Sequence, residues 1–480
     1  MRQPELFMPT EFLHGLYDGG HGAGLYDYWQ MMYHHPRTVG GFLWDLADEG
    51  VVRTDRNGWI DNVGNFGADG IVGPHHEKEG SYYTIRQLWC PVYAETDKNG
   101  KLTGLSTSSD GKYWELEVEN RYDFLNLNTC RFRYEYLAMP NASDPAGKQS
   151  AKVLKTASLQ GPDAAFRTSG ILRIPKSDDL QADVLRITAT DTYGREIMQW
   201  GTQLPKMYDI EGKASNFKVS LDRKTGMLAG VQVNGHKISL TNGPRFVAAR
   251  RSDRSYDQFY NHDDKQAEQK KTEYTLYADP GILQCVDTLS DSRITVRYRL
   301  GCLDSVQYTI DAAKGNIAVH AFYNFTGVVD LMGLAFDYPE SLVQSKAWVG
   351  KGPYRVWKNR MHGPQSGFWQ TDYNDPVPAE SYEYPEFKGY FADVAWMSLQ
   401  TAEGRILLGN GKASDDYIGV YTPRDGRDHI LYQLPETGLS LLRVIPAVRN
   451  KVNTTDLNGP SAQPYWASGS YESVFVLHFE

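Results

Sequence analysis

The stretch KYWELEVENRYDFLNLNTCRFRYEYL, residues 112–137, alternates apolar and polar side chains on both sides of a turn-prone centre. Before the centre, Trp114, Leu116 and Val118 share one face of an extended chain. After the centre, a second set of alternate residues shares one face: Cys130, Phe132, Tyr134 and Tyr136. A period of two is typical of a half-buried β-strand, so this stretch predicts two strands and a mainly β fold.

The same alternation extends in both directions from this stretch. It returns in DVLRITATDTYGREIMQW, residues 183–200, and Asn, Asp and Gly separate the runs. Short strands at this spacing predict a small antiparallel sandwich of immunoglobulin size over residues 91–205. Hairpin signals such as DRKTGM, VNGHK and AAKGN continue beyond it, without a linker-like tract. We therefore expect one large β-sandwich over residues 206–480.

Residues 1–90 have a different pattern. FMPTEFL and TVGGFLWDLAD are typical of short apolar strands, and they flank AGLYDYWQMMYHH, in which Leu25, Trp29 and Met32 share one helical face. Strand, helix and strand in this order predict a parallel pair with a right-handed crossover. Because a parallel sheet is normally covered on both faces, a single such unit would leave an apolar surface exposed.

Composition excludes several classes of function. The 480 residues carry a formal net charge of -9 without a basic stripe, so a nucleic acid partner is not expected. No run of 18 apolar residues is present, so we expect no membrane span. The four cysteines form no CxxC pair, so free thiols are expected rather than a zinc site. The first residues do not resemble a secretory signal, which leaves the compartment open.

Glu11 is the first candidate for chemistry. It lies at the expected carboxyl end of a parallel strand, before a glycine-rich turn, where α/β barrels place catalytic groups. A single carboxylate does not make a mechanism, and a capping or ion-pairing role in a loop is the alternative. The glycine-rich turn lacks the spacing of a phosphate-binding loop, so a tight strand-to-helix turn explains its glycines.

A set of motifs in the first 93 residues resembles glycoside hydrolase family 2, specifically the β-galactosidase type. The motifs are PTEFLHG, a YW helix, GGFLWD and ADGIV, in this order along the chain. The resemblance continues downstream: residues 118–137 are similar to the immunoglobulin-like domain that follows the catalytic barrel in this family. AWVGKGPYRVWKNRMHGPQSGFWQT and FADVAWMSL are similar to signatures of the terminal β-sandwich.

The resemblance implies an architecture and a set of roles. Residues 1–90 would be the last strands and helices of a (β/α)8 catalytic barrel, residues 91–205 an immunoglobulin-like β-sandwich, and residues 206–480 a large β-sandwich of the β-galactosidase small-chain type. Glu11 matches the nucleophile of a retaining glycosidase. The matches that would contact substrate are His14 on sugar hydroxyls, Trp44 under the sugar, Asn65 and Asp69 near a monovalent cation, and Trp466 in a sugar platform.

Several of these matches depart from the family pattern. Asn65 and Asp69 exchange the residue types that the family often has, which puts the sodium site in doubt. Trp466 lies in QPYWASGSY, where the local spacing is shorter than in the family. The alternative for Trp44 and Trp466 is a packed core residue.

The resemblance also implies what this stretch of sequence lacks. The acid/base glutamate, the magnesium ligands and most barrel strands precede the nucleophile in the family, so we expect no cofactor site within these residues. The expected partners are a β-galactoside oligosaccharide or glycan and an N-terminal half, in cis or as a separate chain; a homo-oligomer is also compatible. The function implied is the C-terminal portion of a retaining β-galactosidase-like hydrolase, inactive without the acid/base half. A β-glucuronidase-like specificity, or a non-catalytic carbohydrate-binding or assembly module, are the alternatives.

Overall fold

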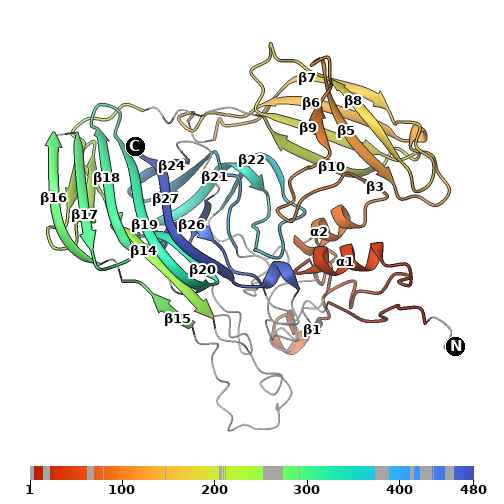
Figure 1. Ribbon diagram of the computed structural model, residues 1–480, viewed down its shortest axis with the longest axis horizontal. Coiled ribbons are helices and arrows are strands. Elements are labelled where there is room, and N and C mark those ends of the chain that lie inside the picture. Colours follow the sequence, from red (N-terminus) through yellow and green to blue (C-terminus); the bar gives the residue numbers. More distant parts are fainter. Residues whose placement is uncertain are drawn as a thin grey trace, which may run out of the picture.

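β-strands dominate the computed structural model, as the alternating pattern predicts (Figure 1). The structure describes residues 5–13, 22–61, 67, 70–78, 80–145, 147–204, 208, 210, 212–251, 274–279, 281–290, 292–372, 389–410, 416–421, 435, 437–448 and 459–480. Among these residues no helix is long and apolar enough to cross a membrane.

The N-terminal segment contains a parallel strand–helix–strand arrangement built from isolated β-bridges. The parallel bridges are Phe7–Thr38, Phe12–Leu43 and Ala47–Val72. Helix α1 (Leu25–His34) connects the first two partners, and it buries Leu25 and Met32, on the face that the sequence predicts. The pairing is confirmed, but among the described residues it consists of isolated bridges. The chain leaves the extended conformation at Leu13, whose φ is 52°. These elements do not show a (β/α)8 barrel.

Short elements complete this segment. They are β1 (Val51–Arg53), η1 (Thr54–Arg56), β2 (Trp59–Asp61) and α2 (Gly80–Leu88). Helix α2 packs beside α1, where Leu25, Ile85 and Leu88 form a small apolar cluster with Leu13. The helices therefore cover one side of the parallel bridges.

Residues 92–203 form two antiparallel sheets that pack face to face. One sheet contains β3 (Val92–Tyr93), β4 (Leu105–Thr107), β5 (Tyr113–Asn120) and β8 (Ser169–Pro175), and the turn η2 (Leu127–Thr129) follows β5. The other has the order β10 (Glu196–Gln203), β9 (Val184–Thr190), β6 (Arg131–Ala138) and β7 (Lys152–Gln160). Leu116, Val118 and Phe132 are buried between the sheets, which confirms the faces predicted from the period of two.

Residues 218–479 form three further sheets around a second, larger core. The three-stranded sheet contains β11 (Lys218–Leu221), β12 (Leu228–Val233) and β13 (His236–Ile238). The five-stranded sheet has the order β15 (Tyr274–Tyr277), β14 (Thr241–Arg251), β20 (Leu331–Asp337), β26 (Leu439–Val444) and β25 (Tyr417–Val420).

The third sheet has nine strands among the described residues. Its order is β16 (Ile282–Ser290), β17 (Arg293–Arg299), β18 (Leu303–Asp311), β19 (Asn316–Val329), β27 (Tyr465–Phe479), β24 (Gly404–Asn410), β23 (Trp396–Thr401), β21 (Val343–Gly352) and β22 (Gln365–Asp372). Turns η3 (Glu340–Leu342) and η6 (Pro460–Ala462) precede β21 and β27. Phe246 and Phe336 of the five-stranded sheet pack with Tyr323 and Phe475 of this sheet in one core.

Candidate active-site segment

Glu11 lies at the carboxyl end of the first parallel bridge strand, and its side chain is exposed. The backbone NH of Phe12 donates to the carbonyl of Phe42 at 3.1 Å, which holds this end of the pair. Phe12 and Leu43 pack against the apolar cluster under α1 and α2. Glu11 therefore lies directly beside the residue that attaches this end of the pair to the helices.

Trp44 follows the bridge residue Leu43 at the same end of the neighbouring strand. Its side chain is 43% exposed in this structure. Glu11 and Trp44 therefore lie at the same end of adjacent parallel strands.

Several large apolar side chains of the parallel segments are more than 40% exposed. We call five of them the apolar seam: Phe7, Val39, Phe42, Trp44 and Leu46. Exposure at this level in consecutive parallel segments is what the sequence predicts for a single strand–helix–strand unit.

Three predicted site residues, His14, Asn65 and Asp69, lie outside the described residues. Nearby, the buried carboxylate of Asp48 accepts from the backbone NH of Gly70 at 2.7 Å. This hydrogen bond gives Asp48 a structural role beside the third parallel bridge. Within the described ranges, no group of three or more His, Cys, Asp or Glu side chains could hold a metal ion.

Trp466 lies near the start of β27, opposite Val328 of β19, and is 67% exposed. The turn η6, which precedes it, is tied to helix α1: the backbone NH and the hydroxyl of Ser461 donate to the Asp27 carboxylate at 2.7 and 2.6 Å. The structure thus anchors the segment before Trp466 on the helix that follows Glu11, but it describes no contact between Trp466 and Glu11.

Helix α1 also contacts both sandwiches through its tyrosines. The Tyr26 ring stacks on His362, with 4.5 Å between centroids and 17° between planes. At the other end, the Tyr33 hydroxyl donates to Glu119 at 2.7 Å, and the Arg121 guanidinium lies over the Tyr33 ring. The motif analysis did not identify these positioning residues, although His362 lies within the WKNRMHG run that carries the resemblance.

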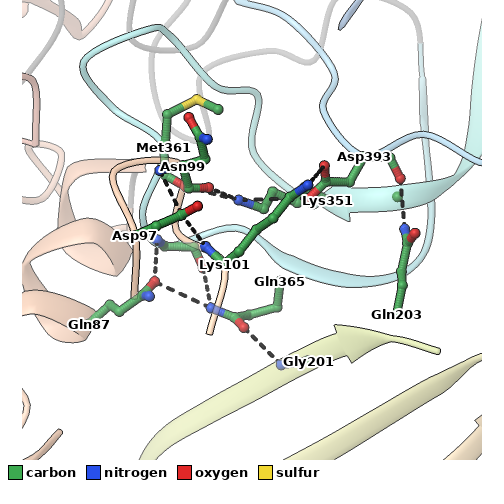
Figure 2. A network of polar contacts seen from close by, with 12 residues as sticks. Gln87, Asp97, Asn99, Lys101, Gly201, Gln203, Lys351, Met361, Gln365 and Asp393 are labelled. Atoms are coloured by element: carbon green, nitrogen blue, oxygen red, sulfur yellow. Dashed lines mark hydrogen bonds and ion pairs between the residues drawn. The ribbon is translucent and has the colours of Figure 1, made fainter. Parts of the chain in front are cut away.

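A polar network joins α2, β10, the turn at residues 97–101 and the segment after β21 (Figure 2). Gly363 NH donates to Gln87 Oε1 at 2.6 Å, and Gly201 NH donates to Gln365 Oε1 at 2.9 Å. Lys351 is buried, and its ammonium donates to the carbonyl of Asn99. This network holds the N-terminal segment, the small sandwich and the large sandwich together.

The buried charge of Lys351 is the element of this network with the largest desolvation penalty. Burial lowers the pKa of the Lys351 ammonium, and the nearby carboxylate of Asp393, with an N–O distance of 4.0 Å, opposes that shift. Loss of the partner of a buried charge lowers the free energy of unfolding by more than the pair contributes to it. The contact between the N-terminal segment and the two sandwiches therefore tolerates little rearrangement around Lys351. The orientation of the N-terminal segment is therefore fixed by contacts far from it in sequence.

Comparisons with known proteins agree with the resemblance. Residues 213–444 match the family model described as beta galactosidase small chain. The beta-galactosidase of Priestia megaterium (strain DSM 319 / IMG 1521) is 20% identical over 497 residues, which cover 92% of this chain and 44% of that protein. The beta-galactosidase of Actinobacillus pleuropneumoniae is 28% identical over 132 residues, 26% of this chain and 11% of that protein.

A solved apo structure of Bacteroides uniformis beta-glucuronidase 3 covers 64% of this chain and 39% of its own, at 11% identity, but its TM-score of 0.17 is too low to carry an argument. The chain spans less than half the length of the curated relatives described above. The family model matches the large sandwich, and the similarity to the Priestia megaterium protein extends, at 20% identity, to the segments before it. The chain is similar to the C-terminal region of β-galactosidases of glycoside hydrolase family 2.

Proposed function

We propose that this chain is the C-terminal portion of a retaining β-galactosidase-type glycosidase, with Glu11 as its nucleophile. The observation that carries the proposal is the placement of Glu11: the residue is exposed and lies next to Phe12, whose bridge to Leu43 ends the first parallel pair. Catalytic groups of α/β barrels occupy this position. Trp44 ends the neighbouring strand and offers an apolar surface of the kind that sugar rings pack against.

The reaction needs a second carboxyl group about 5 Å from the first. In the proposal, an N-terminal half, in cis or as a separate chain, supplies this acid/base and covers the apolar seam. The Glu11 carboxylate attacks the anomeric carbon while the acid/base protonates the departing glycosidic oxygen. Water then hydrolyses the glycosyl ester on Glu11, and the acid/base takes up the proton from that water. His14 would contact sugar hydroxyls, and Trp466 would extend the sugar platform.

Glu11→Gln tests the assignment in the completed enzyme. The chain alone is expected to show no hydrolysis of an aryl β-galactoside, and addition of an N-terminal half with the acid/base is expected to restore it. Glu11→Gln is expected to reduce the restored rate by at least about 10⁴-fold, because the covalent step loses its nucleophile. Glu5→Gln is the matched control, since Glu5 is an exposed glutamate of the same segment.

A labelling experiment separates a nucleophile from a structural carboxylate. A 2-deoxy-2-fluoro-β-galactosyl fluoride should form a stable ester on the peptide that contains Glu11, detected by mass spectrometry. Hydrolysis by the pure chain that disappears in Glu11→Gln would contradict the need for a second half. Faster turnover of aryl β-glucuronides than of β-galactosides by the completed enzyme would favour the alternative specificity.

A further inference from the structure

A groove lies where the small sandwich meets the edge of the nine-stranded sheet, formed by residues other than those proposed for catalysis. Its volume is about 450 Å³, and it is lined by strands β21, β22 and β23 and by the loop between β6 and β7. Ligand sites in proteins typically enclose about 300–1,000 Å³, so this groove is large enough for a short chain of sugar rings. We call it the sheet-end groove.

The strand register shows which side chains share the groove face. Ala347 of β21 lies between Gln370 of β22 and Ser398 of β23, and in the next row Ser345 pairs with Gln400. Paired residues of neighbouring strands share a face of the sheet. The small side chains of the middle strand form a floor, and the long amide side chains of the two outer strands stand beside it.

The loop of the small sandwich that closes the groove is held in place by hydrogen bonds. The Trp396 indole NH donates to the carbonyl of Pro140 at 3.2 Å, and Arg405 Nη1 donates to the carbonyl of Asp144 at 2.9 Å. Gln149, which lines the groove, is buried, and its amide donates to the carbonyl of Asn141 at 3.1 Å. These bonds connect the loop to strands β23 and β24 and order it internally, so the groove is a formed site.

The chemistry of the lining favours a neutral polyhydroxylated ligand. Amide and hydroxyl side chains each offer a donor and an acceptor, which matches the groups on a sugar ring. The charges at the groove include Lys346, whose ammonium donates to the carbonyl of Asp372 at 2.9 Å, and Asp372, which carries a carboxylate. The two opposite charges leave no excess that would select an anion or a cation.

We propose that the sheet-end groove is a non-catalytic binding site for a neutral oligosaccharide. The proposal goes beyond the proposed hydrolysis and does not depend on Glu11. Hydrogen bonds would give most of the affinity, because the lining contains no aromatic side chain among the described residues. Such a site is expected to bind weakly, with a Kd on the order of 1 mM.

Calorimetric titration of the full chain with neutral tetrasaccharides tests the proposal. The probes are β-1,4-galactotetraose, cellotetraose, mannotetraose and xylotetraose, and at least one is expected to bind. Ser345→Tyr places a ring on the groove floor and is expected to raise the Kd at least about tenfold. Gln370→Ala removes an exposed amide without affecting the core and is expected to raise the Kd about threefold.

Two matched controls connect any loss of binding to the groove. Gln307→Ala removes an exposed amide from the same sheet at β18, outside the groove, and should leave the Kd unchanged. Glu11→Gln should also leave it unchanged, which separates this site from the proposed catalytic one. Absence of binding for all four sugars, or binding that persists in both groove variants, would overturn the proposal. Tighter binding of tetragalacturonate than of any neutral sugar would also overturn it, by assigning the groove to an anionic glycan.

Discussion

His362 is a buried ring that stacks on Tyr26 at the joint between helix α1 and the large sandwich. Burial, and secondarily the positive charge of Lys351, lower the pKa of His362 from 6.5 to about 3. Its Nε2 has no hydrogen-bond partner, so a proton there would be both buried and unpaired. The ring is therefore neutral in the folded protein over most of the physiological pH range.

This shift predicts a pH-dependent stability. The unfolded chain binds a proton at His362 as the pH falls through about 6.5, whereas the folded chain does not, so stability is lost between pH 6.5 and about 3. Between pH 7 and pH 5 the free energy of unfolding should fall by about 2 kcal/mol through this group.

His362→Phe keeps an aromatic ring beside Tyr26 and removes the titrating group. Urea unfolding at pH 7 and pH 5 should show that the variant loses about 2 kcal/mol less than the original chain over this interval. His236→Phe, at an exposed histidine of β13, should keep the original pH dependence. Equal losses for His362→Phe and the original chain would contradict the assignment.

At the scale of elements, the contact between α1 and η6 joins two segments that lie far apart in the sequence. Asp27 accepts two hydrogen bonds from Ser461, one from the backbone and one from the hydroxyl. Hydrogen bonds to a charged group contribute about 1.5–3 kcal/mol, so Asp27→Ala should lower the free energy of unfolding by about that amount. Asp55→Ala, at an exposed aspartate of η1, should have a much smaller effect.

A double-mutant cycle would identify the partner of Asp27. If the two residues act through each other, Asp27→Ala combined with Ser461→Ala should cost less than the sum of the single substitutions. Proteolysis should also cut residues 459–464 faster in either single variant. Additive losses would show that Asp27 stabilises α1 without holding η6.

Elements with local signals could be predicted from the sequence. The strands on both sides of the 112–137 turn and the buried face of α1 follow from periods of two and 3.6 residues. The parallel strands at residues 7–13 and 38–48 were predicted longer than they are, since the chain leaves the extended conformation at Leu13. The contacts of Asp27 and His362 could not be predicted, because they join residues hundreds of positions apart that carry no pairing signal. The family motifs identified the individual residues of the proposed site, but they did not predict how these residues are arranged in space.

At the scale of the whole molecule, the apolar seam is the feature with the largest consequence. Phe42, one of its residues, is 59% exposed. Exposed surfaces of this kind drive association of the chain with itself or with a partner. Phe42→Ser should therefore weaken self-association of the isolated chain by about tenfold, and sedimentation velocity over a concentration series would measure it.

Phe124→Ser is the control for that experiment, since Phe124 is 97% exposed on the small sandwich and lies away from the seam. It should leave the association constant unchanged. Equal weakening of self-association by both substitutions would indicate nonspecific association through any exposed apolar side chain. No weakening by Phe42→Ser would show that the seam does not drive association. The same Phe42→Ser substitution should reduce the activity recovered with an N-terminal half, if that half covers the seam.

The order of strands in the nine-stranded sheet has a consequence for synthesis. Strand β27 pairs with β19 on one side and β24 on the other, so the sheet consists of two blocks, β16–β19 and β21–β24, that this strand alone joins among the described strands. During translation both blocks emerge from the ribosome before β27 does. The edges of β19 and β24 therefore remain unpaired during that interval, and a chaperone that shields strand edges would act on this protein at that stage.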